Sequence, residues 1–135
     1  MRLTSFTDYG LRMLMRMASA PDRAFSTADL AQEFNLSRNH LSKIMQRLSQ
    51  AGIVQTKRGG GGGAVMAIAP SELRLGAIVR LLEENQPLVE CLAKGTSACT
   101  LDGRCNLKAR LRAAEISFLK ELDKTSLADI ALAKD

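Results

Sequence analysis

The chain has 135 residues, 46% of them hydrophobic, and a formal net charge of +5, which predicts one domain with an ordinary core and favours a polyanionic partner. Four Phe, one Tyr and no Trp argue against a protein that stacks single-stranded bases. No apolar run is long enough to span a bilayer and charges interrupt the N-terminal segment, so we expect a cytoplasmic protein without membrane contact.

The first predicted element is a helix over residues 3–18. Its main apolar stripe follows spacings of three and four: Leu3, Phe6, Gly10, Leu14 and Met17. Leu11 and Met15 lie off this stripe, which predicts that a second surface covers the helix. Asp8 and Arg12 lie roughly opposite the stripe at i, i+4, where a solvated ion pair is the simplest interpretation.

Two helices joined by a tight turn follow. The first, residues 28–34, has Ser26 or Thr27 as its cap. Ser37 caps the second, residues 38–50. The apolar side chains of this second helix recur with helical spacing: Leu41, Ile44, Met45 and Leu48. The arrangement is typical of a helix-turn-helix.

Polar side chains stand at the exposed N-terminal end of the second helix. They are Ser37, Arg38, Asn39, His40 and Lys43. Arg can hydrogen-bond guanine through two donors and Asn can pair with adenine, while Ser and Lys hold phosphates. We therefore expect this end to contact double-stranded DNA, the alternative being a helical pair with a merely polar outer face.

A hairpin with a basic, glycine-rich tip is predicted next. Residues 53–56 and 64–69 favour strands, and Lys57, Arg58 and a run of five glycines lie between them. Because glycine adds no side-chain bulk, such a tip can approach phosphates or a minor groove, as the wing of a winged helix does. A nucleotide-binding loop does not fit, since no Gly-Lys-Ser/Thr follows the glycines.

Two helices and a tail complete the chain. Residues 75–84 form a short helix that residues 85–87 end. Residues 106–123 form a longer helix with an apolar stripe of Leu107, Leu111, Ala114, Phe118 and Leu122. Because little chain remains to cover this stripe, we expect a partner helix in a symmetric dimer. Thr125 or Ser126 caps a last short helix.

The three cysteines all lie in one polar segment, at Cys91, Cys99 and Cys105. In a cytoplasmic protein an odd number argues against a disulfide framework. Zinc sites favour pairs about two to four residues apart, and reactive thiols give no reason to gather three. Iron–sulfur clusters are also held by thiolates, usually four. The spacing therefore predicts a metal or a cluster without choosing between them.

These segments together resemble the winged-helix iron–sulfur transcriptional regulators of the IscR-like family. The resemblance runs over nearly the whole chain and rests on residues 3–12, Ser37-Arg-Asn-His40, the wing, the three-cysteine loop and residues 118–129. The opening and the Ser-Arg-Asn-His motif look most like the nitric-oxide-sensing repressors of this family. The resemblance implies a homodimeric repressor whose affinity for operator DNA depends on an intact cluster and falls when nitric oxide reacts with it. The alternative on the same scaffold is a regulator of iron or cluster status.

The ligand set implied by the resemblance is Cys91, Cys99, Cys105 and a fourth group. The IscR-type histidine position holds Lys108, and the single histidine lies elsewhere. In the nitric-oxide-sensing members a [4Fe–4S] cluster is completed by an N-terminal aspartate of the partner subunit, which matches Asp8, with Arg12 as its neighbour. Asp102 inside the loop is the local alternative, and [2Fe–2S] is the alternative cluster. The gap of seven residues after the first cysteine is wider than is usual in this family, and the glycine run predicts a looser wing.

The predicted fold class is mainly α, a winged helix-turn-helix with a small two-stranded β wing and a long C-terminal dimerisation helix. We divide the chain into a DNA-binding domain (residues 1–84), a cluster-binding loop (85–105) and a dimerisation helix with a tail (106–135). No nucleophile–base pair or carboxylate dyad is apparent, so we do not expect an enzyme.

Overall fold

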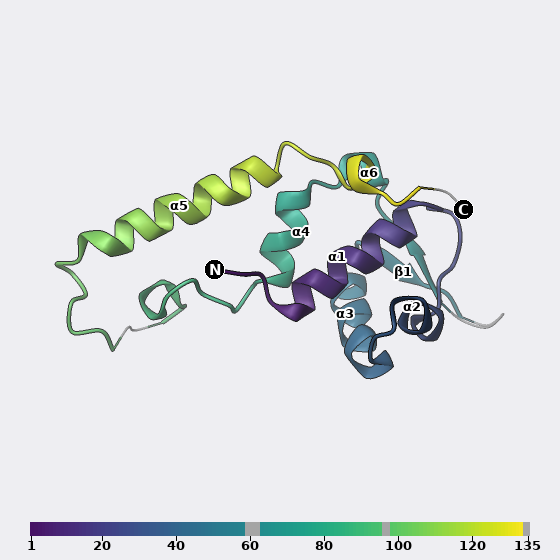
Figure 1. Ribbon diagram of the computed structural model, residues 1–135, viewed down its shortest axis with the longest axis horizontal. Coiled ribbons are helices and arrows are strands. Elements are labelled where there is room, and N and C mark those ends of the chain that lie inside the picture. The colour runs from purple at the N-terminus through teal and green to yellow at the C-terminus, as the bar shows by residue number, and fades with distance from the viewer. Residues whose placement is uncertain (59–62, 96–97, 134–135) are drawn as a thin grey trace.

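The computed structural model describes residues 1–58, 63–95 and 98–133. Its helices are α1 (Ser5–Ala18), α2 (Thr27–Phe34), α3 (Arg38–Gln50), α4 (Leu75–Leu82), α5 (Asn106–Leu122) and α6 (Leu127–Ile130), with short 3-10 turns η1 (Pro70–Glu72) and η2 (Glu90–Leu92). Strands β1 (Val54–Thr56) and β2 (Ala64–Met66) pair antiparallel, with Gln55 opposite Val65. This is the predicted winged arrangement with a long helix near the C-terminus (Figure 1). The glycines at 59–62, predicted as the wing tip, lie outside the described residues.

The turns of the helix-turn-helix form where local chemistry predicts them. Ser26 and Ser37 accept hydrogen bonds from the backbone N–H groups of Asp29 and His40, which caps α2 and α3. Asn35 adopts a left-handed conformation, with φ of 54°, and so turns the chain between the two helices.

α1 runs through the middle of the molecule, in contact with α3, α4 and α6 (Figure 1). The largest fully buried side chains are contributed by α1, α2, α3, β1, α4 and α6: Met13, Leu14, Met17, Leu30, Leu41, Ile44, Leu48, Val54, Ile78 and Leu127. Gly10 permits a close approach of α1 and α4, because a Cβ there would lie 2.7 Å from Leu82 Cδ1. The start of α1 and the end of α4 are therefore packed directly against each other.

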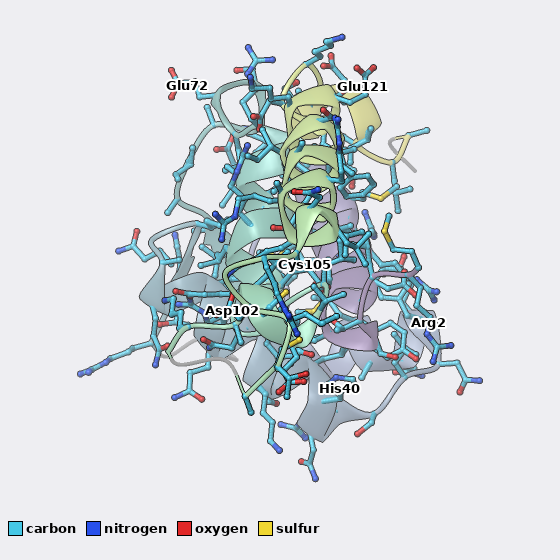
Figure 2. The ribbon with its side chains drawn as sticks, turned by 90° about the vertical axis from the view of Figure 1, so that its left-hand side faces the viewer. Arg2, His40, Glu72, Asp102, Cys105 and Glu121 are labelled. Carbon is cyan, nitrogen blue, oxygen red and sulfur yellow. The ribbon has the colours of Figure 1, made fainter. Side chains whose placement is uncertain are left out.

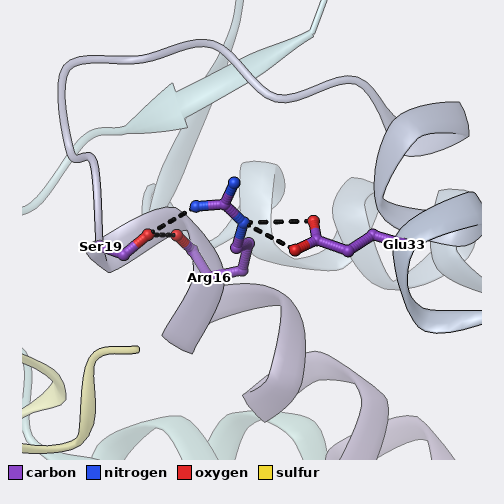
Figure 3. A network of polar contacts seen from close by, with 3 residues as sticks. All are labelled: Arg16, Ser19 and Glu33. Atoms are coloured by element: carbon purple, nitrogen blue, oxygen red, sulfur yellow. Dashed lines mark hydrogen bonds and ion pairs between the residues drawn. The ribbon is translucent and has the colours of Figure 1, made fainter. Parts of the chain in front are cut away.

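A buried arginine joins α1 to α2. Arg16 is 8% exposed, and its Nε donates to both carboxylate oxygens of Glu33, at 3.0 and 3.2 Å (Figure 3). A terminal nitrogen of the same guanidinium donates to Ser19 Oγ at 2.9 Å. These bonds satisfy a charge that would otherwise be costly to bury.

The C-terminal tail returns to the core. The backbone N–H of Leu127 donates to Leu73 at 2.8 Å, and that of Leu132 donates to Met15 at 3.1 Å. Leu127 is fully buried. The predicted second covering surface of α1 thus includes the chain's own tail near Met15.

α5 forms an arm that extends from the core, with the cysteine loop attached to its far end (Figure 1). None of its residues is buried. Leu107 is 61% exposed and Phe118 37%, and Ala114 between them is also exposed. Leu111 and Leu122 of the same predicted stripe are half-buried. A single chain therefore leaves part of the predicted stripe uncovered.

A bidentate ion pair fixes α5 to α4. The Arg80 guanidinium donates to the two Asp123 carboxylate oxygens at 2.7 and 2.8 Å, and these bonds lower the pKa of the Asp123 carboxyl. Gly76 makes room for this contact, since a Cβ there would lie 1.9 Å from Asp123 Oδ1. The pair and the close approach at Gly76, together the α4–α5 joint, hold the end of α5 against α4.

Candidate nucleic-acid interface and cysteine loop

The N-terminal end of α3 is a polar, exposed surface. Ser37, Arg38, Asn39 and Lys43 are all exposed. The Ser37 hydroxyl caps the helix by accepting from the backbone N–H of His40, and its own O–H can still donate to a phosphate. No ion pair is found for Arg38 or Lys43 in the described parts of the chain. Two cations at a helix end that points to solvent provide positive charge for phosphates or base edges.

His40 has different surroundings from its neighbours. Its ring meets the Tyr9 ring edge-on, with centroids 5.2 Å apart, and lies 6.3 Å from the Phe6 ring. His40 is half-buried by these contacts. It therefore joins the start of α3 to α1, a packing role that the sequence analysis did not identify, and its predicted contact with DNA stays a prediction.

The base of the wing stands beside α3. Lys57 donates its backbone N–H to Gly63 at 2.8 Å, which holds the two sides of the hairpin together, and the side chains of Lys57 and Arg58 are exposed. A hollow of about 330 Å³ lies between the start of α2, α3 and the wing. Besides Arg38 and Lys57, its polar lining includes four residues that were not predicted as site residues: Ser26, Thr27, Ser42 and Thr56. The start of a helix was the available signal, because its N–H groups favour anions.

The cysteine loop joins α4 to the far end of α5. Cys91 lies in η2, Cys105 immediately precedes α5, and all three cysteines are half-buried. In the view along α5, Cys105 and Asp102 lie together at the near end of that helix (Figure 2). In the described residues no group of three or more His, Cys, Asp or Glu side chains is close enough to hold a metal ion. The three thiols therefore have to come closer together to bind one.

Each aspartate proposed as a fourth ligand has a cationic partner. Asp8 accepts from Arg12 Nε at 3.1 Å and from a terminal nitrogen at 2.9 Å, and this pair is about half exposed. Asp102 accepts from Lys108 Nζ at 3.1 Å. Arg12 also lies 5.3 Å over the Tyr9 ring, so it joins Asp8 to the aromatic contact with His40. The predicted ion pair of Arg12 and Asp8 is confirmed, while the place of both residues beside a cluster stays a prediction.

Comparison with known proteins decides the family. Residues 3–133 match the Rrf2 family, described as an iron-dependent transcriptional regulator. The chain belongs to the Rrf2 family. It is similar to the HTH-type transcriptional regulator NsrR of Halalkalibacterium halodurans, with 39% identity over all of this chain and 93% of that protein. NsrR of Geobacillus kaustophilus is 40% identical over 96% of this chain and 89% of that protein.

Solved structures agree on the fold. The oxidized form of Staphylococcus aureus CymR superposes with a TM-score of 0.76 at 24% identity, and covers all of this chain and 99% of that one. Bacillus subtilis CymR gives a TM-score of 0.70 at 28% identity, over 97% and 96%. The winged-helix prediction is confirmed. The family and the similar proteins are described as transcriptional regulators, which confirms the expectation of a regulator rather than an enzyme.

Within this Rrf2 regulator, the exposed surface that can meet DNA is built from three elements. The start of α3, the start of α2 and the base of the wing all border the same hollow. No helix in the described ranges has the length and apolar character needed to cross a membrane.

Proposed function

We propose that this Rrf2 regulator is a homodimeric repressor that holds an iron–sulfur cluster through Cys91, Cys99 and Cys105 and senses nitric oxide. The observation that carries the proposal is the gathering of three half-exposed thiols in one loop between α4 and α5, in a chain similar over its whole length to proteins named NsrR. The bound cluster would supply iron that reacts with nitric oxide.

The donor set fits such a cluster. Thiolates are the usual ligands of iron–sulfur clusters, and the segment that carries them has no helix longer than η2 in its described part. Its backbone can therefore rearrange to bring the thiols together without unfolding a core element. A [4Fe–4S] cluster is the type we propose, and it requires one ligand beyond the three cysteines.

We propose Asp8 of the partner subunit as that ligand. Asp8 lies on α1 in the rigid core, and no described group of three ligand side chains includes it. Cross-subunit ligation would explain why it is displayed half-exposed rather than packed against its own loop. Asp102, the alternative, is held by Lys108, which stands in the position of the IscR-type histidine. Arg12 would remain beside Asp8 and balance its charge.

The dimer would form through α5. Leu107 and Phe118 are exposed apolar side chains on one side of this arm. Burying them against the same side of a second α5 removes apolar surface from water and places the two cysteine loops and the two α1 helices in one assembly. The distance between the two α3 helices would then depend on the contacts between the subunits, which are the α5 interface and the ligation by Asp8.

Operator recognition would use the start of α3 and the wing. We propose that Arg38 and Asn39 reach base edges in the major groove, that Ser37 and Lys43 hold phosphates, and that Lys57 and Arg58 contact the backbone or minor groove. Their exposure supports this assignment. His40 would support the helix through Tyr9 while its exposed part faces the DNA.

A regulator of iron or cluster status is the second candidate. The description of the family as iron-dependent favours it, because loss of iron would release the same ligands as nitric oxide does.

The test compares signals on one DNA. Protein reconstituted anaerobically is titrated against a DNA site selected from a random pool, before and after nitric oxide, chelator or oxygen. Loss of binding at stoichiometric nitric oxide, with chelator acting much more slowly, is the expected result. Equal loss with chelator would favour the second candidate, and unchanged binding under every treatment would refute both.

A further inference from the structure

Two consecutive glutamates follow α4, immediately before the cysteine loop. Asn85 comes next and has a positive φ of 74°, so the chain turns away from the core at this point. At this end of the loop they are its attachment to the core, because they directly follow α4. The contacts of these two residues show which elements of the core are linked to the loop.

Glu83 anchors this point to α1. One of its carboxylate oxygens accepts hydrogen bonds from the backbone N–H of Thr4, at 3.1 Å, and from the hydroxyl groups of Thr4 and Thr7. Thr7 is fully buried, and Leu82 next to Glu83 packs against Gly10. A carboxylate at the start of a helix is also favoured by the helix dipole. The end of α4 is therefore fixed to α1.

Glu84 has exposed and exchangeable partners instead. Its Oε2 accepts from Arg47 in the last turn of α3, and its Oε1 lies 3.9 Å from Lys94 Nζ in the cysteine loop. Lys94 is three residues beyond Cys91 and its side chain is 87% exposed. One carboxylate thus contacts both the recognition helix and the loop that holds the cysteines.

We propose that Glu84 is a positioning residue through which the cysteine loop sets the place of α3 on DNA. This inference rests on the proposed function. When the thiols are drawn together, Lys94 moves with Cys91. The distance between Lys94 and Glu84 then changes, and with it the strength of the ion pair between Glu84 and Arg47. Arg47 lies at the opposite end of α3 from Arg38, so a pull on it tilts the end that meets DNA.

The magnitude follows from exposure. The Arg47 side chain is 32% exposed and that of Glu84 45%, so the contact acts in a medium close to water and is screened by salt. Such a pair changes an affinity by about two- to fivefold. Glu84 therefore carries part of the coupling between cluster and DNA, with the subunit interface carrying the rest.

The test is Glu84→Gln, which removes the charge and keeps the shape. Reconstituted and cluster-free forms of the wild type and the variant are titrated against the selected DNA site. The affinity of the reconstituted form divided by that of the cluster-free form should fall by about two- to fivefold in the variant. The visible spectrum of the cluster should stay unchanged. In an Arg47→Met background Glu84→Gln should have no further effect. Glu121→Gln, which breaks the exposed pair with Lys124, is the matched control.

A second readout needs no cluster. In the cluster-free protein, amide hydrogen exchange should speed up in the last turn of α3 and at residues 92–95 in Glu84→Gln, but not in Glu121→Gln. Lys94→Gln should lower the affinity ratio in the same direction, and its exposure rules out a folding defect.

The outcomes separate the inference from the function. An unchanged ratio in Glu84→Gln, or an equal loss of affinity in both forms, would overturn the role of Glu84 and leave the proposed function standing. A wild type whose two forms bind DNA equally would overturn both.

Discussion

Residues of similar polarity at the start of α3 have different surroundings. Arg38, Asn39 and Lys43 are exposed, whereas the His40 ring packs against Tyr9. A change at Arg38 therefore tests DNA contact alone, while a change at His40 also removes a contact between α1 and α3. This difference decides which variants are informative.

Replacing Arg38 by alanine should lower operator affinity by about 1–3 kcal/mol and relax selectivity at one base position. The reason is the loss of two hydrogen bonds to one base, with no loss of packing because the side chain is exposed. Binding to the selected site and to single-base variants of it measures the effect. Unaltered affinity and selectivity would place the recognition surface elsewhere.

Lys57→Ala should lower DNA affinity without changing selectivity. It removes one phosphate contact at the wing, so binding to all sequences should weaken alike. The magnitude of the slope of log affinity against log salt should decrease by about one. Salt titrations with specific and random DNA measure it. A loss confined to the specific site would instead assign Lys57 to base reading.

At the scale of elements, the joint between α4 and α5 holds the arm to the core. It combines the Arg80–Asp123 pair with a glycine that has no room for a side chain. Gly76→Ala should displace α5, because the new Cβ would lie 1.9 Å from Asp123 Oδ1 and 2.7 Å from the backbone oxygen of Leu119. We expect a lower melting temperature and weaker dimerisation, measured by calorimetry and analytical ultracentrifugation.

Adding Asp123→Ala to Gly76→Ala is the control. It removes the carboxylate contact and leaves the backbone contact with Leu119, so it should restore only part of the stability. Full restoration would show that the backbone of α5 adjusts freely, contrary to a fixed joint.

The same joint should respond to acid. The pKa of Asp123 is lowered in the folded state by its hydrogen bonds with Arg80, so its stabilising contribution is present above the unfolded pKa, near pH 4, and is lost as the pH falls through the folded pKa. The protection of amides at the end of α5 from hydrogen exchange, relative to an unfolded chain at the same pH, should decrease in acid in the wild type. It should decrease less in Asp123→Asn. Because Asp129 also has a lowered pKa, the difference between the two proteins is the quantity to measure. Identical acid responses would remove Asp123 from the joint.

At the scale of the whole molecule, two features of the single chain support the proposed dimer. It leaves Leu107 and Phe118 exposed on its arm, and it forms no group of three metal-ligand side chains within the described residues. A dimer with shared ligands, as proposed, would complete both features. The proposal that Asp8 crosses the interface can be tested only with two kinds of subunit in one dimer.

Asp8→Ala subunits mixed with subunits carrying Cys→Ser at 91, 99 and 105 should provide that test. If ligation crosses the interface, each mixed dimer has one complete ligand set and one site without any ligand, so it should bind one cluster with the wild-type spectrum. Iron content and the visible spectrum of the purified mixed dimer measure this. Ligation within a subunit predicts no complete site, and a spectrum like that of Asp8→Ala alone would refute the shared cluster.

The sequence by itself determined the features that depend on neighbours in the chain. Ser26 and Ser37 mark the starts of helices because their side chains act within a few residues, and helical spacing identified Leu41, Ile44 and Leu48 as buried. The resemblance of the chain to known regulators added the interpretation of its cysteines and of Asp8.

The tertiary structure decided the contacts whose partners are far apart in sequence. The tail that covers Met15, the Arg16–Glu33 bond, the packing of His40 on Tyr9 and the contact of Glu84 with Arg47 leave no periodic signal, because each depends on how α1, α3 and α4 cross. Helical spacing indicates which face of a helix is buried but not which element covers it. For that reason the second helix of the helix-turn-helix could be located from the sequence, whereas the contact of its last turn with Glu84 required the packed structure.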